Sequence, residues 1–182
     1  MSAEWVAAVA AAGTFVVIAA SAIAALFQLR HMRTSNQISA YNECRETMDG
    51  PEFREALSFI RNELPERLRD PETVATVAAS SLRGDFAGVR LVANLFESMG
   101  LFVRTGMMDR RIACELWNGI VLDAWSNLRP LTAELRKQRG DGIWVNFEYM
   151  AVLADDFERR FPDGGYPRGV RRMPLDEPAR TQ

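Results

Sequence analysis

The fold is decided by residues 5–29, WVAAVAAAGTFVVIAASAIAALFQL, which contain no charged residue. Glu4 precedes this segment, and Arg30, His31 and Arg33 follow it. At ~1.5 Å of rise per residue, roughly 24 helical residues extend about 36 Å, which exceeds the hydrocarbon core of a bilayer at about 30 Å. The segment therefore predicts a single transmembrane helix that anchors the chain.

The flanking charges predict how this helix lies in the membrane. Positive residues favour the cytoplasmic side, and Arg30 and Arg33, with Arg45 a few turns on, place the positive flank after the segment. Basic charge is carried by Arg almost to the exclusion of Lys, which is typical of G+C-rich bacterial genomes. We expect a single-pass protein of the bacterial inner (plasma) membrane, with its N-terminus outside and its C-terminal domain cytoplasmic. Trp5 is expected in the outer interfacial belt, unless it only begins the apolar span.

Two other interpretations of the segment stay open. Ala20-Ser21-Ala22 has the small-x-small form of a signal-peptide cleavage site, but a signal peptide has a positive leader and an apolar run of about 7 to 15 residues. Here the leader is acidic and the run is nearly twice as long. The second alternative is a helix buried in a soluble core, although such helices seldom run this far without a charge.

The remaining residues, about 150 of them, suffice for one ordinary domain. From Thr34 onward the chain has 20 basic and 23 acidic side chains, so it lacks the positive surface that nucleic-acid binding requires. Cys44 and Cys114 are far apart and belong to no CxxC motif, so both are expected to be reduced thiols in or near the core.

Apolar periodicity in this part predicts helices only. Apolar residues recur at three- and four-residue steps, and the two-residue alternation of strands is absent. We predict an all-α fold: an anchor at 5–29 that continues into a stalk ending at Asp49, and an irregular bundle of about five helices within a domain at 30–161. The helices expected after the stalk are 51–64, 71–82, 86–104 as the central helix, 109–128 and 143–161.

Proline and glycine set the expected boundaries. Asp70 before Pro71 is typical of a helix start. Pro130 is expected to break or kink the helix that precedes it, after which Leu131 to Arg139 can form another turn or two. Gly140-Asp141-Gly142 is expected to form a tight reversal. Residues 162–182 are rich in Pro, Gly and Arg and are expected to form a flexible tail.

Few residues can carry catalysis. The only histidine is His31, at the edge of the span, so di-iron sites with Glu-x-x-His pairs and nucleophiles that need a histidine base lack their imidazole. The motifs GxxxxGK[ST] and GxGxxG are absent. We therefore assign no catalytic residue, no cofactor and no metal site. An enzyme that uses carboxylates, or a metal held by oxygen ligands alone, stays an alternative; its candidates are Glu97, Glu115, Asp123 and Glu148.

Aromatic residues in the last two predicted helices are candidates for a partner surface. Trp and Tyr offer a large contact area with a polar group and are enriched at interfaces. The alternative is core packing, with each indole N–H donated to a neighbouring carbonyl. The candidate residues are Trp117, Trp125, Trp144 and Tyr149.

Five short blocks resemble a known family: Tyr41–Arg45 (YNECR), Arg61–Pro65 (RNELP), Phe96–Phe102 (FESMGLF), Cys114–Trp117 (CELW) and Trp144–Tyr149 (WVNFEY). The chain resembles, over roughly residues 1–161, an uncharacterised bacterial family catalogued as a domain of unknown function. Its members pair an N-terminal membrane helix with a cytoplasmic helical domain. The resemblance implies this fold and topology, and it carries no activity or functional residue.

We expect a non-enzymatic, membrane-tethered module that contacts lipid and binds a protein partner or a second copy of itself. Ala8 with Ala12 and Ala20 with Ala24 have the small-xxx-small spacing that permits close helix approach. An alternative is a subunit of a small oligomeric membrane complex or pore, in which Thr14 and Ser21 lie on nearly one helix face.

The anchor is tested by Val17→Arg. An arginine at the centre of a span costs roughly 2.5 to 3.5 kcal/mol on the insertion scale, so much of the variant is expected to leave the membrane fraction. Sedimentation and carbonate extraction measure this, with Val17→Leu as the matched control. Carbonate resistance equal to that of the wild type would contradict the anchor.

Overall fold

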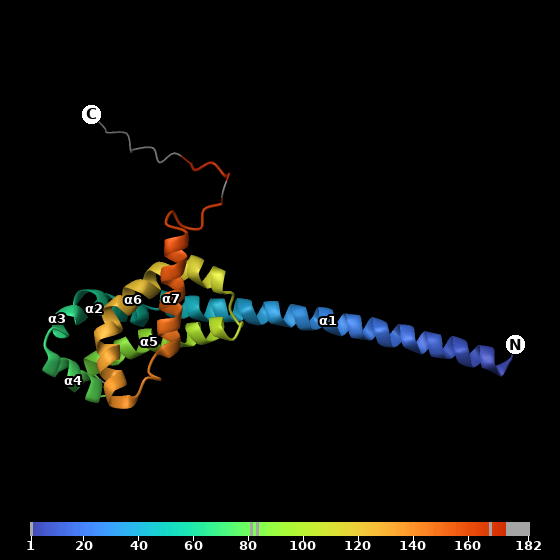
Figure 1. The fold of residues 1–182 in the computed structure, drawn as a ribbon, viewed down its shortest axis with the longest axis horizontal. Coiled ribbons are helices and arrows are strands. Elements are labelled where there is room, and N and C mark those ends of the chain that lie inside the picture. Colours follow the sequence, from blue (N-terminus) through green and yellow to red (C-terminus); the bar gives the residue numbers. More distant parts are fainter. Residues whose placement is uncertain (1, 81, 83, 168, 174–182) are drawn as a thin grey trace.

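The computed structural model of the protein describes residues 2–80, 82, 84–167 and 169–173, without the side chains of 8, 9, 29–36 and 85. The side chains of Arg30, His31 and Arg33, predicted to anchor the span, therefore lie outside the described residues. No strand occurs in the described ranges, and the predicted all-α fold is confirmed (Figure 1). The elements are α1 Ala3–Asp49, α2 Pro51–Asn62, α3 Leu64–Arg67, α4 Pro71–Ala79, the 3-10 turn η1 Gly84–Phe86, α5 Ala87–Arg104, α6 Arg110–Arg139 and α7 Val145–Arg160.

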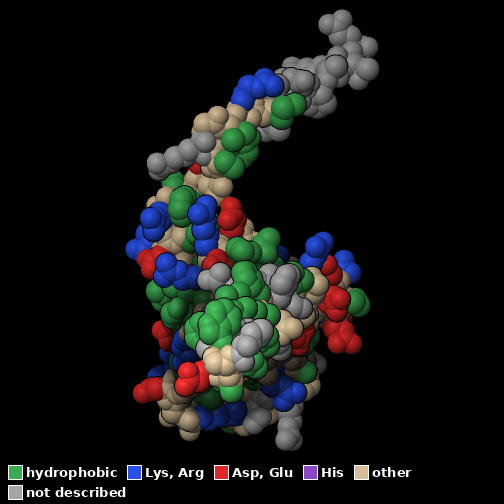
Figure 2. Space-filling model, turned by 90° about the vertical axis from the view of Figure 1, so that its right-hand side faces the viewer, with side chains coloured by type: hydrophobic (Ala, Val, Ile, Leu, Met, Phe, Trp, Pro, Cys, Tyr) green, Lys and Arg blue, Asp and Glu red, His purple; other side chains and the backbone are tan. Residues whose placement is uncertain are grey.

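Helix α1 runs for 47 residues without a break and joins the apolar segment to the bundle. Its part Ala3–Gln28 is long and apolar enough to cross a membrane, and none of its most apolar 18-residue window is buried. Phe15, Val17 and Phe27 are all exposed. Figure 2 looks toward the N-terminal end of α1 and shows hydrophobic side chains gathered at the centre of the view. The segment therefore forms no part of this chain's own core, which the alternative of a helix buried in a soluble core requires.

The two hydroxyl groups inside the apolar segment are satisfied by the helix itself. Thr14 donates to the carbonyl of Ala10 at 2.9 Å, and Ser21 donates to the carbonyl of Val17 at 2.8 Å. Such bonds let a hydroxyl lie in an apolar medium without a polar partner from another helix.

The last turns of α1 belong to the domain. Ala40 and Cys44 are buried there. Tyr41 lies between them in sequence: its hydroxyl donates to the carbonyl of Asp109 at 3.1 Å and accepts from the Asp109 N–H at 3.0 Å. Its ring stacks on Trp117 at a centroid distance of 5.8 Å. Helix α1 is therefore fixed to the start of α6.

Helix α5 is the central helix, as predicted, and packs against α2 and α7. A row of aromatic rings crosses the core through it. Phe53 of α2 meets Phe96 of α5 edge-on at 6.1 Å, and Phe96 lies 5.1 Å from Phe147 of α7. Trp125 of α6 then meets Phe147 edge-on at 5.1 Å. Four helices thus share one continuous aromatic core.

Of the break or kink predicted at Pro130, the break is wrong, because α6 continues through it to Arg139. A proline inside a helix costs roughly 3 kcal/mol through a lost hydrogen bond and a steric clash. Leu128, Leu131 and Leu135 are buried on either side of it, and each contributes roughly 1.5 to 3 kcal/mol. Pro130 itself is exposed, so water can reach the carbonyl that its missing N–H leaves free. Packing therefore outweighs the local preference.

The other boundary signals act as predicted. Asp70 caps α4, since its carboxylate accepts from the N–H groups of Glu72 at 3.2 Å and Thr73 at 3.0 Å. Hydrogen bonds to Thr73 and Glu72 hold the pKa of Asp70 below its ordinary value. Gly140, with φ of 94°, begins the reversal between α6 and α7.

Candidate functional site

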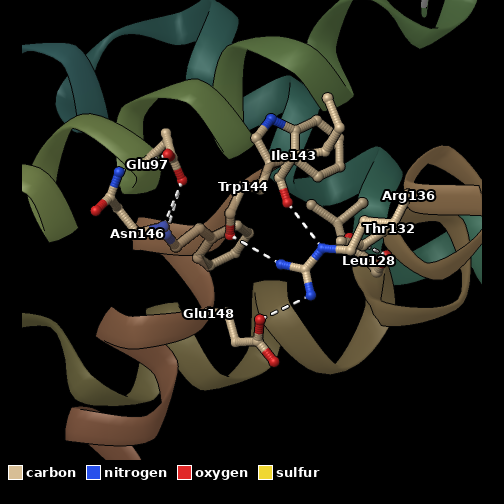
Figure 3. A network of polar contacts seen from close by, with 9 residues as sticks. Glu97, Leu128, Thr132, Arg136, Ile143, Trp144, Asn146 and Glu148 are labelled. Atoms are coloured by element: carbon tan, nitrogen blue, oxygen red, sulfur yellow. Dashed lines mark hydrogen bonds and ion pairs between the residues drawn. The ribbon is translucent and has the colours of Figure 1, made fainter. Parts of the chain in front are cut away.

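One guanidinium holds the turn between α6 and α7 (Figure 3). The Nε of Arg136 donates to the carbonyl of Ile143 at 2.9 Å, and its Nη2 donates to the carbonyl of Trp144 at 3.5 Å. Its Nη1 donates to the Glu148 carboxylate at 2.7 Å. Trp144 adopts the left-handed conformation with φ of 52°, which is uncommon for a residue other than glycine. Arg136 therefore stabilises a backbone bend that the sequence alone disfavours.

Glu97 of α5 caps α7 from outside that helix. Its Oε2 accepts from the N–H groups of Asn146 and Phe147, each at 2.9 Å, and its Oε1 accepts from the Asn146 side-chain amide at 2.6 Å. Trp144, at the N-cap position, gives α7 no side-chain cap. The first N–H groups of a helix need acceptors, and a carboxylate also suits the positive end of the helix dipole. Glu97 supplies both the hydrogen-bond acceptors and the negative charge.

A glycine one turn further along α5 lets α7 approach this closely. A Cβ atom on Gly100 would lie 1.9 Å from the carbonyl oxygen of Asn146. No side chain fits at that distance, so α5 and α7 touch backbone to backbone here. The pair Glu97 and Gly100 therefore fixes the position at which α7 starts.

A groove opens on another side of α5, where it faces α2. Its main cavity, of about 640 Å³, has an apolar floor that includes Ala56, Phe59 and Leu91, and its rim carries Glu52, Glu55 and Glu63. Two smaller cavities of about 350 and 230 Å³ also border on Leu91 and extend the hollow to the end of α1 at Glu46 and Thr47. We call this continuous hollow the acidic groove; its remaining lining residues are Gly50, Pro51, Phe53, Ser58, Ala87, Gly88, Arg90, Asn94, Leu95 and Ser98.

Negative charge in the acidic groove is mostly uncompensated. Glu63 lies 3.4 Å from Arg67. Within the described part of the chain, Glu46, Glu52 and Glu55 form no ion pair. Arg90 is the one basic side chain among the lining residues. The groove therefore combines an apolar floor with a negative rim.

Comparison with known protein families identifies the family of this chain. The family model described as a domain of unknown function, DUF4760, matches residues 15–152. The chain belongs to this family. The match reaches from within the apolar segment of α1 into α7, so it covers the second half of the candidate span and nearly the whole bundle. No curated protein and no solved structure shows detectable similarity to the chain.

In this DUF4760 chain, the four aromatic candidates for a partner surface contact different helices. Trp117 stacks on Tyr41 of α1, and Trp125 packs on Phe147 of α7. Trp144 is buried, and its indole N–H donates to the Asn94 side-chain carbonyl at 3.3 Å. Tyr149 is half-buried. The core-packing alternative accounts for the ring contacts, and an interaction role for these residues stays a prediction.

The four carboxylate candidates each have a separate neighbour. Glu97 caps α7, Glu148 pairs with Arg136, and Asp123 pairs with Arg61. Glu115 lies 3.9 Å from Arg111. Among the described residues, no group of three or more His, Cys, Asp or Glu side chains could hold a metal ion. The structure does not bring these carboxylates together.

Both cysteines are free and buried. Burial raises the pKa of the Cys44 thiol to about 11, with a smaller contribution from Glu43. Burial also raises the pKa of Cys114, which Arg110 opposes. Both side chains are therefore neutral thiols near pH 7.

Sequence reasoning missed the acidic groove and the role of Glu97. One signal for the groove was available, since residues 43–72 contain nine acidic and five basic side chains. The groove itself forms only where α2 packs on α5, and these two helices come from segments that are distant in sequence. The excess of acidic residues alone therefore does not reveal it. No local pattern identifies Glu97 as a cap, because the helix that it caps begins about 50 residues later.

The approach of α5 to α7 is tested by a matched pair of substitutions. In Gly100→Ala the new methyl group meets backbone, so we expect a loss of ~1–3 kcal/mol of stability. In Gly119→Ala, within α6, nothing lies within 4 Å of the new atom, so we expect a gain of roughly 0.5–1 kcal/mol. Thermal unfolding in detergent measures both as opposite shifts in Tm. Equal shifts would contradict the backbone contact.

The cap is tested by Glu97→Gln, which keeps the shape of the side chain and removes its charge. Hydrogen bonds to a charged group contribute roughly 1.5–3 kcal/mol, and we expect a loss of about 1–2 kcal/mol because part of the bonding survives. Thermal unfolding followed by tryptophan fluorescence measures the change. Glu158→Gln, at an exposed position of α7, is the control, and a Tm no lower than that of the control would refute the capping role.

Proposed function

We propose that the chain is a single-pass protein of a bacterial inner membrane, with its N-terminus outside, whose cytoplasmic domain binds a partner protein in the acidic groove. The exposed apolar surface of Ala3–Gln28 supports the anchor. The basic residues after the span, Arg30 and Arg33, support the orientation.

The acidic groove carries this proposal because its two properties select one kind of occupant. An amphipathic helix binds by placing its apolar face in an apolar groove. Carboxylates at the rim attract a positively charged partner and disfavour a negative one. Glu52 and Glu55 have no basic partner among the described residues, so they are available to a lysine or arginine from outside. The occupant we propose is a basic amphipathic helix of another protein.

Dimensions of the groove agree with such an occupant. Helix α2, which forms one wall, has 12 residues, a length of about 18 Å. A partner helix of similar length presents apolar residues at positions i, i+3 or i+4, and i+7 to the floor at Phe59 and Leu91. Lysine or arginine on either side of that stripe then faces Glu52, Glu55 and Glu63.

The unbroken helix α1 gives the groove a fixed place relative to the bilayer. Tyr41, which ties α1 to the domain, lies 12 residues after Leu29, or about 18 Å along a helix. A tether of this kind confines the groove to a layer near the membrane and raises its effective concentration there. This higher effective concentration favours binding of partner proteins that are themselves at the membrane.

A defined peptide tests the groove. The full chain in neutral nanodiscs is titrated with a labelled amphipathic helix of leucine and lysine, and with a scrambled peptide of the same composition. By fluorescence anisotropy, we expect the amphipathic peptide to bind more tightly. The double variant Glu52→Arg, Glu55→Arg is expected to weaken its binding at least tenfold, or about 1.4 kcal/mol, and the remote Glu158→Arg to leave it unchanged. Equal binding of the two peptides, or binding indifferent to the double variant, would refute the groove.

Cross-linking in cells identifies the occupant. A photoreactive amino acid at Ser58, within the groove, is expected to yield a product with another protein that disappears in the double variant. A product of two copies of this chain would assign the groove to self-association and overturn the proposed partner.

A further inference from the structure

A separate cavity of about 460 Å³ lies between the start of α6 and the end of α7. Arg110 and Arg111 line it from α6, and Arg160 lines it from α7. Asp156 is the single carboxylate in its wall, which is completed by Cys114, Leu153, Phe157 and Phe161. We call it the arginine cavity. Its charge is opposite to that of the acidic groove, and it shares no lining residue with that groove.

Positive charge in the arginine cavity exceeds what the protein compensates. Asp156 accepts from Arg159, outside the cavity, at 3.0 Å. Arg111 is 3.9 Å from Glu115, at the limit of an ion pair. Arg160 lies 5.7 Å from the Phe161 ring, which attracts a cation without neutralising it. In the described part of the chain, Arg110 forms no ion pair. The cavity therefore contains guanidinium groups whose positive charge no carboxylate of the described residues neutralises.

The position of two of these arginines adds to the excess. Arg110 and Arg111 are the first residues of α6, where the helix dipole is positive and basic side chains are unfavourable. The Asp109 carboxylate accepts from the Ile112 N–H at 3.0 Å and so caps a single N–H of that end. An anion in the cavity would meet both the guanidinium groups and the positive helix end.

We propose that the arginine cavity binds a phosphate-bearing organic anion. The planar guanidinium forms paired hydrogen bonds that match phosphate oxygens. Leu153, Phe157 and Phe161 offer an apolar wall to the organic part of the ligand. The volume falls within the range of small-molecule sites, roughly 300–1,000 Å³. Cys114, a neutral thiol in the wall, adds no charge.

The phosphate can belong to a soluble molecule or to a lipid headgroup. The start of α6 lies on the side of the domain from which the free part of α1 extends (Figure 1). The tie at Tyr41 places this end about 18 Å beyond Leu29 along α1. Both sources present the same chemistry to the arginines, so the experiment distinguishes them.

The first measurement uses the full chain in nanodiscs of neutral phosphatidylcholine. Titration calorimetry with phenyl phosphate is expected to show saturable binding that is tighter than binding of inorganic phosphate, because only the former has an apolar part. Arg110→Gln and Arg160→Gln are each expected to weaken it at least tenfold. Arg69→Gln, an exposed residue paired with Glu66, is the control and should bind as the wild type does.

The second measurement reads the cavity itself through Cys114. In a Cys44→Ala background, with folding checked by thermal unfolding, the rate of Cys114 modification by methyl methanethiosulfonate is followed. Slowing by phenyl phosphate in neutral discs indicates a soluble ligand. Slowing in discs that contain phosphatidylglycerol, without added phosphate, indicates a lipid headgroup. In either case Arg110→Gln should abolish the slowing.

The proposal is overturned by an absence of saturable binding together with an unchanged Cys114 rate in both kinds of disc, or by binding that both glutamine variants retain. Neither probe nor variant involves the acidic groove. A negative result for the arginine cavity therefore says nothing about partner binding in the acidic groove. A negative result for the groove likewise says nothing about the arginine cavity.

Discussion

The contact between Glu97 and the first turn of α7 is the constraint on which the rest of the bundle depends. Helix α7 begins after a left-handed tryptophan and has no side-chain cap of its own, so its exposed N–H groups need an acceptor from elsewhere. Glu97 provides it at 2.9 Å. Gly100 then permits the backbones to touch, and the Phe96–Phe147 contact follows between them. The far end of α7, which lines the arginine cavity, takes its position from this start.

A feature of this structure can be predicted from the sequence when the residues that cause it are close together in the chain. The long apolar helix at the N-terminus is predictable because 25 consecutive residues lack charge. The start of α4 is predictable because Asp70, Pro71 and Glu72 are adjacent. Pro130 gives a wrong prediction of a helix break because its local effect is outweighed by the burial of leucines in the same helix, Leu128, Leu131 and Leu135. Glu97 and the acidic groove escape prediction because both arise where segments distant in sequence meet.

The five blocks that carry the family resemblance meet one another in space. FESMGLF and WVNFEY contain the two sides of the α5–α7 contact, Glu97 and Gly100 against Asn146. YNECR and CELW contain Tyr41 and Trp117, which stack where α1 joins α6. RNELP contributes Arg61, paired with Asp123 of α6. These blocks specify how helices pack, which explains why they indicate a fold and name no reaction. Residues that would bind a ligand lie mainly outside them.

The two candidate binding regions differ in charge and in place. The acidic groove begins at the C-terminal end of α1 and follows α2 and the part of α5 from Ala87 to Ser98. The arginine cavity lies where α6 begins, next to Asp109, which is bonded to Tyr41. A charge separation of this kind inside one small domain costs little, because salt screens exposed charges beyond about 8–10 Å. It has a consequence for specificity: a basic helix is attracted to the groove and repelled from the cavity, and an anion shows the reverse preference. Because the two regions share no lining residue, ligands of opposite charge can occupy both at once.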